Sequence, residues 1–599
     1  MSAILGISAF YHDSAAALII DGEIVAAAQE ERFSRIKHDP GFPAKAVEYC
    51  LGEAGISPGD LDHVGFYDKP FLKFERLLET YVATVPFGIQ SFFKSIPVWL
   101  QKKLHLPREM KKALGGNYQK RFVFTEHHES HAASAFFPSP FDEAAILTLD
   151  GVGEWATASF GTGKGNRITL THEQHFPHSL GLLYSAFTQY CGFRVNSGEY
   201  KLMGLAPYGE PRFCDLIYDH LIDLKEDGSF RMDLSYFDYV AGLSMVSPKF
   251  ETLFGEPRRM PESEISQHFM DVAASIQVVT EEIMVRCARH LRKATGMNRL
   301  CLAGGVALNC VGNGGILQEG IFDDIWIQPA SNDAGGALGV AQFIWHQLLD
   351  QPRFPNGKTD GQSGSLLGPR FQHVDCVETL QREHAVFRRI ESDDERAKWI
   401  AGQIAGGKVI GLFQGRMEFG PRALGSRSIL GDPRSPKMQR LINLKIKYRE
   451  SFRPFAPSVL PEKSHEWFDF EEGQESPYML LVTNVRKEKQ LPVSDDPLEG
   501  LEKLEVPRSE VPAVTHVDGS ARVQTISRET HQFYHRIVTA FEELTGCPMV
   551  VNTSFNVRGE PIVCHPDDAW RCFMATEMDV LVLEDLVLLK EEQKEGTNG

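Results

Sequence analysis

Residues 4–28 read ILGISAFYHDSAAALIIDGEIVAAA, and this stretch decides the fold of the first half of the chain. Its short apolar runs predict three strands, over 4–8, 15–20 and 23–28. Asp21-Gly22, between the second and third runs, is a residue pair typical of a tight β-hairpin. The turn at 9–14 follows the first strand and carries polar side chains, including His12. We therefore expect an antiparallel sheet that presents polar groups at one end.

A second strand–turn–strand unit follows later in the chain. The apolar run at 144–149 leads into Asp150-Gly151-Val152-Gly153-Glu154, and another strand is expected over 155–160. The two units are either unrelated hairpins or the duplicated phosphate-binding hairpins of the superfamily of actin, sugar kinases and heat-shock ATPases. The spacing alone leaves both interpretations open.

Two turns rich in small residues each follow a predicted strand. One turn covers 303–309, after a strand over 300–302, and the other covers 331–337, after a strand over 324–328. Such turns let the backbone approach a nucleotide closely and direct amide donors at it. The candidate nucleotide-binding residues in this half of the chain are Gly151, Gly304, Gly305 and Asn309.

The chain is long enough for two domains, because 599 residues exceed one ordinary core. The stretch 351–369 is rich in Pro, Gly, Ser and Asn, which is typical of a linker. We therefore expect domains at 1–350 and 370–599. Strands of the second domain are predicted over 409–413, 549–552 and 580–583. A long helix is expected over 264–292, and the acidic stretch 462–512 is expected to be a surface insertion.

The motif His127-His128-Glu129-Ser130-His131 is the strongest short signal for a metal. His127 and His131 are four residues apart, so on a helix they share a face. With Asp333 as a carboxylate donor they form a set typical of Fe(II), and zinc or manganese would also fit. The alternative is two histidines at a helix start and surface, with Asp333 as a helix cap.

His12 allows a catalytic and a structural interpretation. A histidine in this turn can act as a general base on a hydroxyl group, oriented by the adjacent Asp13. It can equally be an ordinary turn residue.

The charge distribution has one strong exception. The chain carries a net charge of −18, which argues against a general nucleic-acid binder. The window 416–453 nevertheless contains ten basic residues and three acids, a net charge of +7. Seven of the ten are arginines, which bind phosphate or carboxylate in a bidentate manner. The window, which includes Arg416 and Arg422, predicts a polyanion or nucleotide-phosphate site rather than a solvated basic face.

Targeting and redox signals are weak. The N-terminus shows no basic region before an apolar stretch, and no apolar run has the length of a bilayer span. The ten cysteines form no CxxC pair, which argues against a zinc ribbon or a redox dithiol. We expect a cytoplasmic protein with no nucleic-acid partner and no membrane partner.

Over essentially its whole length, the chain resembles the O-carbamoyltransferases of the NodU/CmcH/TobZ group. Many motifs in one order carry this resemblance: Gly6–Asp13, His127–His131, Gly198–Pro207, Gly304–Asn309, Glu418–Ser428, Lys447–Pro457, His516–Gln524 and Asn552–Pro561. The hydrogenase-maturation carbamoyltransferases share both modules but also carry zinc-binding cysteine pairs, so that branch is disfavoured here.

The resemblance implies an α/β N-terminal domain with the actin-like ATPase (ASKHA) fold, similar to the tRNA threonylcarbamoyl-transferase, and an α+β, YrdC-like C-terminal domain. The C-terminal domain would convert carbamoyl phosphate and ATP, with Mg²⁺, to carbamoyl-adenylate. The N-terminal domain would transfer the carbamoyl group to a hydroxyl of a small-molecule acceptor, such as a natural product or a sugar. The resemblance also suggests Fe²⁺ or another divalent metal, a role in antibiotic biosynthesis and a homodimer.

The resemblance assigns roles residue by residue. It makes His127, His131 and Asp333 the iron ligands, His12 the acceptor-side histidine and Lys37 a lysine that binds the intermediate. The expected ligands of ATP and carbamoyl phosphate are Arg416, Arg422, Lys447, Arg449, Arg522, Ser554 and Asn556.

Two alternative functions follow from the same features. A sugar or metabolite kinase of the actin fold would explain the hairpins and the glycine-rich turns, but not the histidine pair or the basic window. A non-enzymatic nucleotide-binding regulator would need no metal.

Overall fold

A computed structural model describes residues 2–101, 103–492, 498 and 500–593, which form two compact units. Unit 1 contains Met1–Glu30 and His38–Gln362, and unit 2 contains Glu31–Lys37 and Ser363–Gly599. The chain passes from unit 1 to unit 2 within the stretch predicted as a linker. The segment Glu31–Lys37 belongs to unit 2, whereas the sequence analysis placed it in the N-terminal domain.

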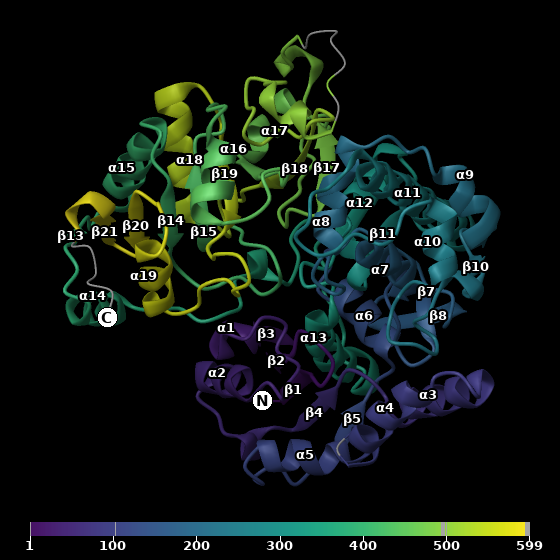
Figure 1. Cartoon of the computed structure of the whole chain (residues 1–599). Helices are drawn as coiled ribbons and strands as arrows, with labels where there is room; N and C mark the ends of the chain where they lie inside the picture. Colours follow the sequence, from purple (N-terminus) through teal and green to yellow (C-terminus); the bar gives the residue numbers. More distant parts are fainter. Residues whose placement is uncertain (1, 102, 493–497, 499, 594–599) are drawn as a thin grey trace. The chain divides into compact units, whose positions relative to one another are not determined.

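Unit 1 contains two five-stranded sheets with the same topology (Figure 1). The first has the order β3-β2-β1-β4-β5, and the second has the order β8-β7-β6-β11-β12. In both, the central strand pairs antiparallel with the next strand and parallel with the fourth. The strands are β1 (Ala3–Ser8), β2 (Ala15–Ile20), β3 (Glu23–Gln29), β4 (His63–Phe66), β5 (Phe122–Phe124), β6 (Glu143–Leu149), β7 (Ala156–Lys164), β8 (Arg167–His175), β11 (Arg299–Ala303) and β12 (Asp324–Ile327). This repeated α/β arrangement confirms the fold class predicted for the N-terminal half.

The first hairpin forms as its sequence predicts. Ile20 pairs with Glu23, which leaves Asp21 and Gly22 as a two-residue turn with φ values of 50° and 91°. Positive φ at both positions is the requirement of the turn type that Asp-Gly favours.

Helices cover the two sheets of unit 1. The principal ones are α2 (Ala44–Ala54), α3 (Pro70–Thr84), α4 (Ile89–Gln101), α5 (Leu106–Ala113), α6 (His127–Phe136), α7 (Leu180–Tyr190), α11 (Gln267–Thr295), α12 (Cys310–Gln318) and α13 (Asp333–Phe343). The long helix α11 starts after Ser266, three residues later than expected, and Ser263 instead donates its hydroxyl to the carbonyl of Met260 in the preceding turn.

Close packing of α13 against α6 sets up the site described below. A Cβ added at Gly339 of α13 would lie 1.8 Å from the carbonyl oxygen of Ser130 of α6. Only glycine permits this approach. It holds Asp333, the first residue of α13, near the start of α6.

Unit 2 is built on one nine-stranded mixed sheet in the order β13-β21-β20-β14-β15-β19-β16-β18-β17. Its strands are β13 (Arg388–Arg389), β14 (Ile410–Phe413), β15 (Arg427–Gly431), β16 (Ala456–Val459), β17 (Leu481–Asn484), β18 (Ser520–Thr525), β19 (Met549–Ser554), β20 (Val580–Leu583) and β21 (Leu586–Leu589). Its helices include α1 (Glu31–Ser34), α14 (His373–Arg382), α15 (Asp393–Ala405), α16 (Met438–Leu441), α17 (Pro461–Trp467), α18 (Gln532–Thr545) and α19 (Pro566–Met574). The YrdC-like character of this α+β unit stays a prediction.

The stretch 462–512 differs from the predicted surface insertion. Within it, β17 pairs antiparallel with β18 and extends the sheet at its edge. Residues 493–497 and 499 of this stretch lie outside the described residues.

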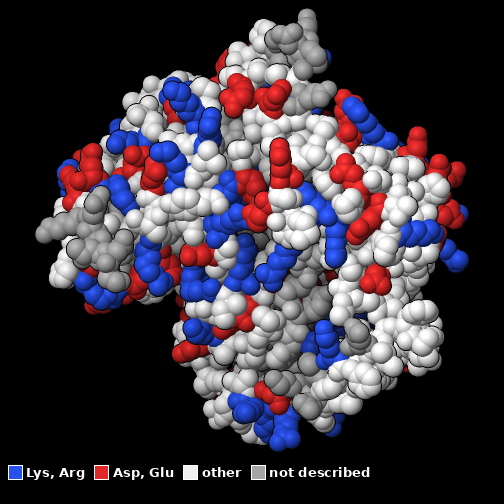
Figure 2. All heavy atoms as spheres, viewed as in Figure 1, with Lys and Arg blue, Asp and Glu red and all other residues white. Residues whose placement is uncertain are grey.

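The segment Glu31–Lys37 is anchored in unit 2 by two arginines. Arg32 donates to the carbonyl of Gly420 at 2.8 Å, and Arg35 donates to the carbonyls of Pro561 and Ile562 at 2.9 and 2.6 Å. On the face drawn in Figure 2, acidic and basic side chains are interspersed over much of the surface. Among the described residues, no helix has both the length and the apolar character needed to cross a bilayer.

Candidate functional site

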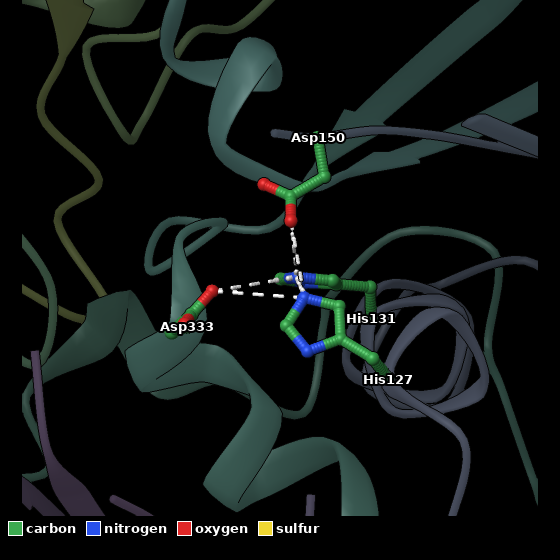
Figure 3. Close-up of side chains that lie close together, drawn as sticks. All are labelled: His127, His131, Asp150 and Asp333. Atoms are coloured by element: carbon green, nitrogen blue, oxygen red, sulfur yellow. Dashed lines mark hydrogen bonds and ion pairs between the residues drawn. The ribbon is translucent and has the colours of Figure 1, made fainter. Parts of the chain in front are cut away.

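Four buried side chains of unit 1 converge on one point (Figure 3). His127 and His131 come from consecutive turns of α6, Asp150 follows β6, and Asp333 starts α13. Nε2 of His127 lies 3.0 Å from Oδ2 of Asp150, 3.1 Å from Nε2 of His131 and 3.7 Å from Oδ1 of Asp333. Nε2 of His131 lies 3.9 Å from each of the same two carboxylate oxygens. The structure thus brings together the three predicted metal ligands and adds Asp150.

This geometry fits a metal ion. The four donor atoms all lie within 4.8 Å of one another. Metal–ligand bonds of about 2.0–2.2 Å place neighbouring donors roughly 3–3.5 Å apart, close to the spacing seen here. Two imidazoles with carboxylates suit iron, zinc or manganese. The residues support a divalent cation without selecting iron.

The electrostatics of the cluster also favour a cation. Burial opposes protonation of His127, but the carboxylates of Asp150 and Asp333 outweigh it and raise its pKa. Burial, together with the charge on His127, lowers the pKa of His131 to about 4, so this ring is neutral and able to coordinate. Burial disfavours the charged form of Asp150, yet its hydrogen bond to His127 holds its pKa well below the usual value.

Local interactions fix the start of α6 and hence its two ligands. Glu126 and Glu129 form a capping box at the helix N-terminus, and the carboxylate of Glu154 accepts a hydrogen bond from the backbone N–H of His127. His128 has a structural role. Its Nδ1 lies 2.7 Å from the hydroxyl of Thr148, and burial lowers its pKa to about 3.

Asp150 is the functional residue that sequence reasoning missed. Its Oδ1 accepts a hydrogen bond of 2.8 Å from the backbone N–H of Gly305, so it joins the metal cluster to the predicted nucleotide turn. Gly304 has φ of +91°, and a Cβ there would lie 2.2 Å from the carbonyl oxygen of Leu149. Gly151 directly follows Asp150 and is half-buried. The position of Asp150 at the end of a strand beside Gly151 was the signal available in the sequence.

Asn309 has a different environment from the two glycines. Its side chain accepts a hydrogen bond from the backbone N–H of Gly312 at the start of α12 and pairs with the amide of Gln277 at 3.1 Å. These contacts hold Asn309 in place behind the glycine turn.

His12 lies beside the metal cluster. Its Nδ1 is 3.0 Å from Oδ2 of Asp13, and its Nε2 is 4.0 Å from Oδ2 of Asp333. Burial disfavours the charged form, but Asp333 and Asp13 outweigh it and raise the pKa of His12 to about 9. His12 therefore carries a proton near pH 7 in this arrangement. A role as general base requires the neighbouring carboxylate charge to be neutralised first.

Lys447 forms the centre of a second candidate site, in unit 2. Its Nζ lies within hydrogen-bonding distance of four oxygens at the end of β19 and in the loop after it: the carbonyl and hydroxyl of Ser554 at 2.7 and 3.2 Å, and the carbonyl and side chain of Asn556 at 2.8 and 2.5 Å. Burial lowers its pKa well below the usual value, and the charges of Arg449 and Lys37 lower it further. The structure thus brings together Lys447, Arg449, Ser554 and Asn556 of the predicted phosphate ligands, and places Lys37 near them in unit 2.

The remaining predicted phosphate ligands have mixed environments. Arg416 donates to the backbone carbonyls of Leu367 and Gly368 at 2.7 and 3.1 Å. It therefore holds the end of the predicted linker, residues 351–369, in place. Arg422 and Arg522 are half-buried. Arg427, which sequence reasoning counted only as part of the basic window, is fully buried, with its guanidinium 3.6 Å from the centre of the Phe413 ring.

Comparison with known proteins gives concordant results. The model of the family "Carbamoyltransferase N-terminus" matches residues 3–342, and that of "Carbamoyltransferase C-terminus" matches residues 401–590. The chain is 59% identical to "Uncharacterized protein sll1178" of Synechocystis, over 99% of this chain and 97% of that protein. It is 38% identical to the nodulation protein NolNO of Sinorhizobium fredii, over 97% of this chain and 79% of that protein. It is also 38% identical to the nodulation protein NolO of Bradyrhizobium diazoefficiens, over 78% of each. On these matches, the chain belongs to the carbamoyltransferase family and is a carbamoyltransferase enzyme.

Proposed function

We propose that this enzyme is an ATP-dependent O-carbamoyltransferase that acts through carbamoyl-adenylate. Water first cleaves carbamoyl phosphate to carbamate and phosphate. The carbamate oxygen then attacks the α-phosphorus of ATP, which gives carbamoyl-adenylate and pyrophosphate. Finally, the acceptor hydroxyl attacks the carbamoyl carbon, AMP leaves, and the hydroxyl proton is lost. The products are the O-carbamoylated acceptor and AMP.

We assign adenylate formation to unit 2. Lys447, Arg449 and the loop containing Ser554 and Asn556 offer the cationic, donor-rich surroundings that polyphosphate requires. A phosphate oxygen that replaces one of the loop oxygens around Lys447 would favour the protonated form of its amine. ATP with Mg²⁺ is the expected co-substrate.

We assign transfer to unit 1. His127, His131, Asp150 and Asp333 would hold the divalent cation, whose chemistry there is polarisation of the carbamoyl carbonyl or a phosphate oxygen. His12, 4.0 Å from Asp333, is placed to accept the acceptor's hydroxyl proton once Asp333 is neutralised by a bound cation. The backbone at Gly151, Gly304 and Gly305 would contact the adenylate phosphate.

One observation carries the proposal: the same chain has a buried four-donor cation site in one unit and a buried lysine among oxygen acceptors in the other. The family assignment as an enzyme removes the non-enzymatic regulator from consideration. A kinase of the actin fold would leave the site around Lys447 without a role.

Incubation with ATP and carbamoyl phosphate tests the proposal. We expect pyrophosphate release that depends on both substrates, and transfer of a carbamoyl group to a hydroxyl acceptor detected by mass spectrometry. Formation of ADP and a phosphorylated sugar would instead support the kinase. Candidate acceptors are small natural products and sugars with free hydroxyls.

A further inference from the structure

An apolar surface lies where α3 meets α4 in unit 1. Five apolar side chains within residues 82–93 are between 60% and 76% exposed: Val82, Val85, Phe87, Ile89 and Phe93. Single exposed apolar residues are common on soluble proteins, but a cluster that includes two phenylalanines marks an interaction surface. In the space-filling view, the end of α3 has few charged side chains (Figure 2).

A strongly basic segment adjoins this apolar surface. Residues 89–121, which include α4 and α5, contain eight basic residues and a single acid, a net charge of +7 in a chain of −18. No acidic residue occurs between Thr80 and Arg108. Lys94, Arg108 and Lys112 are exposed, and none of them forms an ion pair with another residue in the described part of the chain. In Figure 2, basic side chains gather around α5.

The combination of apolar and basic side chains favours a lipid surface over a second copy of the chain as the partner. A two-fold dimer through this surface would bring the same +7 segment against itself, which is electrostatically unfavourable. A lipid surface with anionic headgroups accommodates both features, because phenylalanines and aliphatic side chains enter the boundary between headgroups and acyl chains while Lys and Arg bind the phosphates.

We propose that the C-terminal turn of α3, together with α4 and α5, docks the enzyme reversibly on an anionic lipid bilayer. The apolar side chains between Val82 and Phe93 insert at the interface, and Lys94, Arg108 and Lys112 contact the headgroups. The docking surface contains none of the four donors of the His–Asp cluster, and it departs from the sequence-based expectation of no membrane partner. The opposite face of α3 turns inward, where Lys73 pairs with Asp68 at 2.9 Å. Docking through the outer face would therefore leave the inward face of α3, which carries Lys73, covered by protein.

Vesicle flotation of the full-length protein tests this proposal. We expect flotation with vesicles of phosphatidylcholine and phosphatidylserine, little with phosphatidylcholine alone, and release at high salt, which screens the charges. The double variant Phe87→Ser/Phe93→Ser and the triple variant Lys94→Glu/Arg108→Glu/Lys112→Glu should each lower the bound fraction at least about tenfold, because each basic residue near the surface contributes several-fold. Phe354→Ser is the matched control, since Phe354 is 89% exposed but lies outside the surface.

Circular dichroism and thermal unfolding of each variant establish that it folds, and light scattering measures its mass. The proposal is overturned if the wild type does not float, if it binds both vesicle types equally, or if folded variants bind like the wild type. It is also overturned if the Phe87→Ser/Phe93→Ser variant converts a dimer to a monomer while the wild type binds no vesicles, because the surface is then an interface between copies.

Discussion

The His–Asp cluster of unit 1 and the Lys447 site of unit 2 are both buried, yet they need ligands of opposite charge. In unit 1, the carboxylates of Asp150 and Asp333 lie close to His127 and raise its pKa, so the cluster favours positive charge where a cation would fit. In unit 2, burial and neighbouring cations lower the pKa of Lys447, so that site disfavours its own positive charge. One site is completed by a cation and the other by an anion.

Because the two sites need ligands of opposite charge, the chemistry of each unit can be tested separately. A change that removes the cation from unit 1 should leave phosphate chemistry in unit 2 intact, and the reverse should also hold.

The largest effect is expected from Lys447→Met or Arg449→Ala. Loss of one charge-assisted contact to phosphate costs about 1.5–3 kcal/mol, and more if the contact tightens in the transition state. A loss of about 3 kcal/mol corresponds to roughly a hundredfold in rate. We expect pyrophosphate release from ATP and carbamoyl phosphate to fall at least that far, while metal content stays at the wild-type level. The measurement is a coupled pyrophosphate assay together with metal analysis.

Lys437→Ala provides the control for this prediction, because Lys437 is exposed in the same basic window. If Lys437→Ala and Arg449→Ala lower the rate equally, the window is a solvated basic face and adenylation occurs elsewhere.

His131→Ala should remove the metal and stop carbamoyl transfer. His131 supplies one of four donor atoms and has a pKa lowered to about 4, so it binds as a neutral ligand near pH 7. Pyrophosphate release should remain largely intact. Elemental analysis of the purified variant and an acceptor assay measure the two effects. His128→Gln is the control. The imidazole of His128 contacts the hydroxyl of Thr148 rather than the metal cluster, so this variant should keep more metal than His131→Ala. Full metal content in His131→Ala would contradict the ligand set.

Asp150→Asn should weaken metal binding by about tenfold to a hundredfold, a range typical of changes close to a metal ligand. Asn keeps the size of the side chain and its hydrogen bond from Gly305, but removes the charge next to His127. The dissociation constant for Mn²⁺ or Zn²⁺, measured by titration, reports the effect. An unchanged constant would show that three ligands suffice and that Asp150 acts only through Gly305.

Local sequence signals predicted the parts of the fold that local chemistry determines. Asp21-Gly22 forms its two-residue turn because both positions require positive φ. The first and last histidines of the motif share a helix face because their spacing matches one turn. The spacing of the two strand–turn–strand units left open whether they are related, and only the family resemblance implied the sheet order that the two sheets share.

Long-range packing determined what the sequence could not show. Asp150 reaches the histidines because β6 and α6 lie together in the tertiary structure. Its place at a strand end beside Gly151 is visible in the sequence, but this local pattern does not show which residues the side chain meets. The segment Glu31–Lys37 gave no sign of its place in unit 2, because its anchors, Arg32 and Arg35, bind carbonyls hundreds of residues away.

The smallest expected effect, and the sharpest test of the comparison, is the sign of proton exchange on binding. At the His–Asp cluster, the neighbouring carboxylates raise the pKa of His127, and a metal ligand must be deprotonated. Metal binding should therefore release protons, from His127 and from His12 beside it. At Lys447 the pKa is lowered, and a bound polyphosphate stabilises the protonated amine. ATP binding at a pH above that lowered pKa should therefore take up a fraction of a proton.

Calorimetric titrations in two buffers with different ionisation enthalpies measure both values. His127→Ala should lower the release, and Lys447→Met should abolish the uptake. Proton release in both titrations would mean that Lys447 is already charged before ATP binds, and the electrostatic contrast between the two units would then fail.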